Sequence, residues 1–136
     1  MTTTPQIPEK PAVAARPDSS AAVLYMCAER GRLTPTLAAQ RAEEEGREYA
    51  AARNLRLVEV VTDPYGQPDP CHRDGWMRVR ELADEGQIAA VIVRWPAAIS
   101  PDAWHEMRHR EIRWLQEQGV AVCYSWAPLA ASGQVK

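Results

Sequence analysis

The sequence has 136 residues, of which 46% are hydrophobic and 25% charged, and its formal net charge is -2. This length and composition are typical of one soluble globular domain. The slight acidity argues against a dedicated DNA-binding domain, because such domains carry a basic excess that neutralises phosphates. An odd and sparse set of three cysteines, Cys27, Cys71 and Cys123, favours reduced thiols over a disulfide framework.

The two ends of the chain differ in composition from its centre. Residues 1–20 are rich in Thr, Pro, Ala and Ser and include Pro5, Pro8, Pro11 and Pro17, so they predict a disordered leader. Residues 129–136 predict a flexible tail, which leaves 21–128 as one domain. No long apolar run indicates a membrane span, and no apolar core follows the N-terminus as in a secretory signal. We therefore expect a cytoplasmic protein.

Strand and helix patterns alternate along the first half of the domain. Ala21–Ala28 is a short apolar run and predicts a strand. Thr34-Pro35 is typical of a helix start, and the Ala- and Glu-rich segment after it predicts a helix to about Arg53. Leu55–Thr62 is β-branched and predicts a second strand. Asp63–Cys71 is rich in proline and predicts a loop.

The alternation continues in the second half. Ile88–Val93 is a continuous apolar run, which is typical of a strand covered on both faces. A helix is expected before it, with Gly86 in the left-handed conformation at its end. Apolar residues at helical spacing define the buried face of that helix: Trp76, Val79, Leu82 and Ala83.

A third helix and a fourth strand complete the pattern. Ser100-Pro101-Asp102 predicts the start of the helix, Gly119 its end, and Val120–Tyr124 the strand. We expect one apolar stripe of this helix to be buried. The stripe consists of Ala103, Trp104, Met107, Ile112, Trp114 and Leu115.

This order predicts an α/β fold with three layers. Short apolar strands separated by helices favour a mostly parallel sheet of four to five strands with helices on both faces. Sites in such sheets form at the carboxyl ends of the strands. The expected loops at that edge are Cys27–Arg30, Thr62–Gly66, Arg94–Ser100 and Ser125–Pro128.

Several short segments together carry a family resemblance. Tyr25-Met26-Cys27-Ala28-Glu29 ends the first strand, and Gln40 lies early in the first helix. Asp63 comes directly after Thr62 at the end of the second strand, Arg73-Asp74-Gly75 lies at the start of the second helix, and Pro96 to Ser100 follows the third strand. In order and spacing, residues 22–128 resemble the catalytic domain of the resolvase/invertase (serine recombinase) family. The resemblance implies a resolvase-like fold and a site at the carboxyl edge.

The same resemblance predicts that catalysis is lost. The family uses a serine to attack a DNA phosphodiester and arginines to stabilise the transition state. Glu29 stands at the serine position and Cys27 at the preceding arginine position. The family's Asp-Arg-Leu-x-Arg set is replaced by residues that include Pro96, Ala97 and Ser100. Since one lost transition-state donor costs about 2.7–4 kcal/mol, we expect no strand exchange.

We therefore expect a catalytically silent relative, a pseudoenzyme that acts as a protein-interaction or regulatory module. Its expected partner is another recombinase or a second copy, and its expected setting is a mobile element. We expect only weak DNA binding of its own and no membrane contact. We expect no cofactor and no metal. The family's long dimerisation helix and helix-turn-helix domain are also expected to be missing. The alternative is an active serine recombinase that uses Ser100 or Ser125, the serines nearest the strand ends.

The residues that match the family have two interpretations. Gln40, Asp63 and Arg73 are either relics of a catalytic site or structural residues, in which case Asp63 caps a turn and Arg73 starts a helix. Cys27 and Glu29 lie two apart on a strand and could pair as nucleophile and base, but a buried small side chain is the favoured interpretation of Cys27.

Three other groups of side chains also have two interpretations each. His105 and His109 are spaced to share a metal, although a solvated face is favoured because no third ligand is evident. Trp95 and Trp126 lie at strand ends where a ligand could stack, with burial under a loop as the favoured interpretation. A solvated face is also expected for the basic side of the last helix, which carries Arg108, Arg110 and Arg113.

Overall fold

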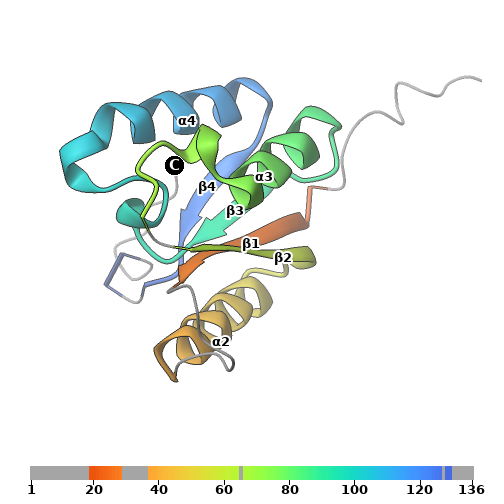
Figure 1. The fold of residues 1–136 in the computed structure, drawn as a ribbon. Helices are drawn as coiled ribbons and strands as arrows, with labels where there is room; N and C mark the ends of the chain where they lie inside the picture. Colours follow the sequence, from red (N-terminus) through yellow and green to blue (C-terminus); the bar gives the residue numbers. More distant parts are fainter. Residues whose placement is uncertain (1–18, 29–36, 65, 127, 130–136) are drawn as a thin grey trace, which may run out of the picture.

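A computed structural model describes residues 19–28, 37–64, 66–126 and 128–129. Four parallel strands form one sheet in the order β2-β1-β3-β4 (Figure 1). The strands are β1 (Ala21–Ala28), β2 (Arg56–Pro64), β3 (Ala90–Val93) and β4 (Ala121–Tyr124). The helices are α2 (Leu37–Ala52), α3 (Asp74–Asp84) and α4 (His105–Glu117), with short 3-10 turns η1 (Pro70–His72), η2 (Pro96–Ala98) and η3 (Asp102–Trp104).

Helices cover both faces of the sheet, so the predicted three-layer α/β fold is confirmed. In Figure 1, α2 lies on one face while α3 and α4 lie on the other. Alternate residues of β1 supply the two cores, because successive side chains of a strand point to opposite faces. Val23 and Tyr25 pack into the core beneath α3 and α4, and Leu24 packs into the core beside α2.

The local signals for the middle helix are confirmed. The predicted buried face of α3 is buried, and Gly86 follows the helix with a φ of 72°. Gly119 likewise follows α4 with a φ of 82°. Both glycines have the left-handed conformation expected where a helix stops. The structure also confirms the strand at Ala21–Ala28.

Two sequence predictions need correction. Asp63 and Pro64 belong to β2 rather than to a loop, because they pair with Cys27 and Ala28 of β1. The third strand is shorter than predicted and begins at Ala90. The first helix begins at Leu37 within the described residues, and its predicted start at Thr34-Pro35 lies outside them.

The last helix differs most from its prediction. Ser100-Pro101-Asp102 does not cap it, since a 3-10 turn intervenes and α4 begins at His105. Ala103 and Trp104 of the predicted apolar stripe are exposed because they belong to that turn. The side chain that α4 buries beside Leu115 is charged, namely Glu111.

Within the described residues, no helix is long and apolar enough to cross a membrane. Residues 1–18 and 130–136, which contain most of the predicted leader and tail, lie outside the described part of the chain.

Candidate functional site at the carboxyl edge of the sheet

The carboxyl ends of all four strands meet at one edge. The parallel register pairs Cys27 with Asp63 and Val93 with Tyr124, so the segments after the strands start side by side. This edge is where a ligand site of an open α/β sheet is expected. Most residues that match or depart from the family pattern lie there.

Asp63 is 4% exposed, and every oxygen of its carboxylate has a partner. The backbone N–H groups of Gly75 and Trp76 donate to it at 2.7 and 2.8 Å. The phenol of Tyr25 donates a third hydrogen bond, at 2.7 Å. Because Gly75 and Trp76 open α3, the carboxylate satisfies helix N–H groups that would otherwise lack partners. The structure thus places Asp63 in the structural role, as a cap that joins β2 to α3.

Gly75 is required by this contact. A Cβ at this position would lie 2.6 Å from Oδ2 and 2.7 Å from Oδ1 of Asp63. Such distances are shorter than real Cβ contacts, so any larger side chain would displace the carboxylate. The glycine therefore lets β2 approach the first turn of α3 closely.

Arg73 is 6% exposed and holds three segments together. Its Nε donates to the carbonyl of Gln67 at 2.8 Å, and its Nη1 donates to the carbonyl of Ala98 at 2.9 Å. The same Nη1 donates to the phenol oxygen of Tyr25 at 3.1 Å. Burial raises the pKa of the Tyr25 phenol above its ordinary value, although the positive charge of Arg73 opposes the shift. Much of the hydrogen-bonding capacity of this arginine is therefore used inside the protein.

A small pocket opens beside these two residues. Its volume is about 300 Å³, and its walls are mainly polar. Asp63, Arg73 and half-buried or exposed residues between the end of β2 and the start of α3 line it: Pro64, Gly66, Gln67, His72 and Asp74. The pocket offers an anion one buried guanidinium, but it also presents two carboxylates.

Cys27 is half-buried, and its thiol lies 3.7 Å from the carbonyl oxygen of Pro64. Burial raises the pKa of this thiol, the guanidinium of Arg73 opposes the shift, and Asp63 adds to it. The thiol is therefore less reactive at neutral pH than a free cysteine. Glu29, its proposed partner base, lies outside the described residues. Gln40 is exposed near the start of α2.

The loop after β3 carries mainly small and apolar side chains between Trp95 and Ser100. Pro96 is half-buried and Ala97 exposed in η2. Ser100 is fully buried, and its hydroxyl lies 2.9 Å from the carbonyl of Pro68 and 3.2 Å from that of Trp104. Ser125, the other strand-end serine, is 5% exposed and donates to Glu45 at 3.4 Å. Neither hydroxyl faces solvent as a nucleophile must.

Other arginines near this edge are also engaged within the protein. Arg108 donates to the carbonyl of Ser100 at 2.7 Å and to Asp102 at 2.8 Å, so it does not lie on a purely solvated face. The Nε of Arg94 lies 3.1 Å from Glu45 in an ion pair too bent to be a hydrogen bond. A phosphate approaching this edge would have to compete with these contacts.

A second buried polar cluster, which the sequence pattern does not predict, lies between α3 and α4. Glu111 is fully buried and accepts from the Trp76 indole at 2.8 Å, from Arg80 at 2.7 Å and from Arg110 at 2.9 Å. The thiol of Cys71 donates to it at 3.3 Å. Burial alone would raise the pKa of Glu111, but these hydrogen bonds hold it below its ordinary value. No local sequence signal distinguishes this glutamate from a solvated one.

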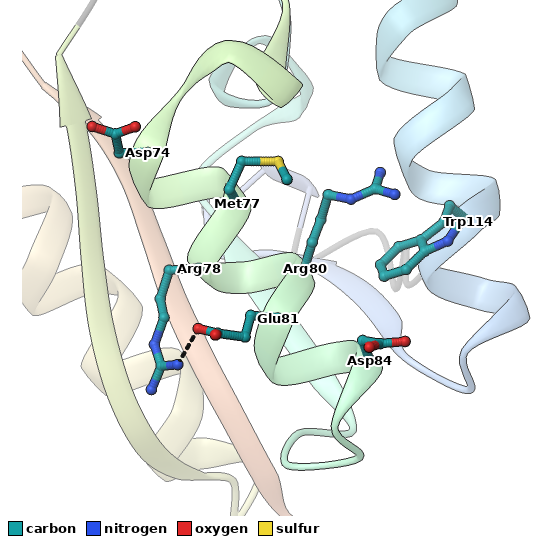
Figure 2. Close-up of a pocket in the computed structure, with 7 residues that line it drawn as sticks. All are labelled: Asp74, Met77, Arg78, Arg80, Glu81, Asp84 and Trp114. Carbon is teal, nitrogen blue, oxygen red and sulfur yellow. Dashed lines mark hydrogen bonds and ion pairs between the residues drawn. The ribbon is translucent and has the colours of Figure 1, made fainter.

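A groove of about 580 Å³ lies on the outer side of this cluster (Figure 2). Arg80 of α3 stacks over the ring of Trp114 of α4, with its guanidinium carbon 4.0 Å from the ring centroid. Arg78 pairs with Glu81 and with Glu59 of β2. Both arginines of the groove are thus paired with carboxylates, Arg78 with Glu59 and Glu81 and Arg80 with Glu111.

The two histidines on α4 face each other without a third ligand among the described residues. The rings of His105 and His109 are edge to face at 5.6 Å, and both side chains are exposed. Across the described part of the chain, no group of three or more His, Cys, Asp or Glu side chains could hold a metal ion.

Comparison with solved structures defines the fold class. No family model and no curated protein matches the sequence. The C-terminal catalytic domain of ISC1926 TnpA, an IS607-like serine recombinase, is similar in structure with a TM-score of 0.66 and 16% identity, over 78% of this chain and 70% of that one. The N-terminal catalytic domain of TP901-1 integrase is similar with a TM-score of 0.62 and 11% identity, over 77% and 76% of the two chains.

The fold is therefore that of a serine recombinase catalytic domain, as the sequence resemblance implied. Identities of 16% and 11% define the fold and not the chemistry. The chemistry of this chain depends on its own side chains.

Proposed function

We propose that residues 21–128 form a recombinase-fold module that does not cleave DNA and instead binds another protein, either an active recombinase or a second copy of this chain. The observation that carries the proposal is the environment of Ser100. This serine is fully buried, and both oxygens within reach of its hydroxyl are backbone carbonyls. A DNA phosphodiester could not reach it without unfolding of the surrounding loops.

The state of the arginines supports the same proposal. Transition-state stabilisation requires donors that point to the place where charge develops. Arg73 donates to two backbone carbonyls and a phenol, and Arg108 donates to a carbonyl and a carboxylate. With a net charge of -2, the chain also lacks the basic excess that strong phosphate binding needs. We infer that its own affinity for DNA is weak.

We propose that the protein acts in the cytoplasm and that its gene belongs to a mobile element. The free thiols of Cys27, Cys71 and Cys123 are compatible with a reducing compartment. The reason for proposing a mobile element is the similarity of the fold to serine recombinase catalytic domains.

The second candidate is an active serine recombinase. It is favoured by the shared fold and by Arg73, which lines the polar pocket next to Asp63. This candidate needs a hydroxyl nucleophile, and the strand-end serines Ser100 and Ser125 are the ones to test.

One experiment separates the two candidates. The full chain is incubated with supercoiled plasmids and analysed on denaturing gels for a covalent protein–DNA adduct, beside the S100A/S125A double variant. We expect no adduct from either protein. An adduct formed by the wild type and lost in the variant would establish the enzyme.

A tagged pull-down from the native host, with and without nuclease, tests the protein-binding role. The proposal predicts a specific protein partner or self-association that survives nuclease treatment. A monomer that retains no protein, or a complex that nuclease dissolves into free protein and DNA fragments, would overturn it.

A further inference from the structure

Two half-exposed tryptophans form a rigid aromatic corner at the carboxyl edge. Trp95 and Trp126 are 36% and 37% exposed, and their rings meet edge to face with centroids 5.4 Å apart at 78°. Burial under a loop was the favoured sequence interpretation, and the exposure of both rings contradicts it. An exposed pair of large aromatic rings is a feature of binding surfaces rather than of an ordinary solvated edge.

The backbone holds this corner in place. The N–H of Ser125 donates to the carbonyl of Val93 at 2.9 Å, and the N–H of Trp126 donates to the carbonyl of Arg94 at 3.0 Å. These bonds extend the β3–β4 pairing beyond the strands. The guanidinium of Arg94 lies 4.6 Å from the centroid of the Trp95 ring and covers part of it. The pair is therefore preorganised, which lowers the entropic cost of binding a ligand.

A segment of the same chain has the chemistry that such a surface recognises. Pro5-Gln6-Ile7-Pro8-Glu9-Lys10-Pro11 places a proline at every third position. A polyproline II helix has three residues per turn, so this spacing would align the three rings along one face. Proline-rich segments with this repeat bind to surfaces lined by aromatic side chains, because their binding conformation carries a low entropic cost.

The intervening chain is long enough for the contact. Leu24 pairs with Ile92, so Trp95 lies near the level of Cys27, roughly 20 Å along the strand direction from Ala21. Ser20 is held beside β2, where its carbonyl accepts from the N–H of Arg56 at 2.6 Å. Residues 12–18 before it can span about 23 Å when extended, and each residue before them adds about 3.3 Å. Pro8 and Pro5 therefore have chain to spare for a path around the helix layer.

We propose that residues 5–11 bind across the Trp95–Trp126 pair through their three prolines. This inference stands independently of the proposed function, since it concerns a contact of the chain with itself.

The test compares the full-length wild type with the full-length P5A/P8A/P11A variant by the NMR signals of the indole N–H groups. Single Trp→Phe variants assign each signal. We expect the signals of Trp95 and Trp126 to shift in the proline variant, while that of Trp104, exposed but outside the pair, stays in place. The P17A variant is the matched control and should leave both signals unchanged. Unchanged Trp95 and Trp126 signals in P5A/P8A/P11A would overturn the proposal.

A reciprocal measurement guards against an indirect effect. In the full-length W126A variant, the backbone amide signals of residues 5–11 should move, whereas W104A should leave them in place. A synthetic peptide of residues 3–13 added to P5A/P8A/P11A should restore the wild-type indole positions in a saturable manner. Failure of the peptide to move either indole signal would count against direct contact. An unchanged far-UV circular dichroism spectrum of P5A/P8A/P11A would show that the variant keeps its fold.

Discussion

The carboxylate of Asp63 accepts a hydrogen bond of 2.8 Å from the backbone N–H of Trp76. This contact links the end of β2 to the first turn of α3 and joins two elements of the predicted site. An aspartate that sequence spacing aligns with a catalytic family position is thus engaged in holding a helix. Its surroundings give rise to the first two predictions.

Replacement of Asp63 by alanine should destabilise the fold by about 3 kcal/mol. The change removes the cap of α3 and leaves the buried Tyr25 hydroxyl without its acceptor. Asp63→Asn retains an acceptor oxygen and should lose less stability than Asp63→Ala. Urea unfolding followed by circular dichroism measures the free energy of unfolding of both variants. The control is Asp84→Ala at the exposed end of α3, whose free energy of unfolding should stay within about 0.5 kcal/mol of wild type. Equal stability of Asp63→Ala and wild type would contradict the structural role.

Gly75→Ala should also destabilise the protein, by about 1–3 kcal/mol. Alanine is the better helix former by about 1 kcal/mol, so propensity alone predicts the opposite sign. The added Cβ would lie 2.6 Å from the Asp63 carboxylate, and this clash should dominate. Thermal unfolding provides the comparison, with the exposed Met77→Ala on the same helix as a control. A higher melting temperature for Gly75→Ala would show that the carboxylate can move aside.

Glu111 should make the stability of the fold depend on acidic pH. Hydrogen bonds from Trp76, Arg80 and Arg110 hold the folded pKa of Glu111 below its ordinary value despite the opposing effect of burial. The stabilisation is therefore present above the unfolded pKa of about 4.3 and is lost as pH falls through the lower, folded pKa. Urea unfolding at a series of pH values from 2 to 7 should show a smaller loss of stability in Glu111→Gln than in the wild type.

The same variant should be less stable at neutral pH, by about 3 kcal/mol, because its arginine partners lose a buried counter-charge. This value is at the low end for a buried pair, since Arg80 and Arg110 are 24% and 48% exposed and retain access to water. Glu117→Gln, exposed on the same helix, serves as the control. An identical acid profile in Glu111→Gln and wild type would assign the acid sensitivity to other groups.

Cys27 should react slowly with a small alkylating reagent at pH 7.5. Burial raises the pKa of this thiol, with Arg73 opposing, so the thiolate fraction at neutral pH is below that of a free cysteine. Mass spectrometry of the alkylated peptides should show labelling several-fold slower than in the urea-unfolded chain, and the rate should rise with pH through a midpoint above about 8.5. Faster labelling in the folded protein would revive the hypothesis of a Cys27 nucleophile.

The sequence by itself determined the order of the elements. Ala21–Ala28 and the run around Val91 predict strands because their apolar composition is a local property. Gly86 and Gly119 mark helix ends because the left-handed conformation favours glycine whatever packs nearby. Repeated alternation of strand and helix then restricts the fold to a parallel, two-sided sheet.

Only the tertiary structure decided what the polar residues do. Glu111 receives its hydrogen bonds from Cys71, Trp76 and Arg80, which lie 31 to 40 residues away in sequence, so no local pattern reveals that it is buried. Likewise, Ser100 is inaccessible because Pro68 from the loop after β2 lies against it. Hydrophobic periodicity is a property of residues that are close in sequence. The hydrogen-bond partner of a buried charge or hydroxyl comes instead from a distant segment that the fold brings within about 3 Å.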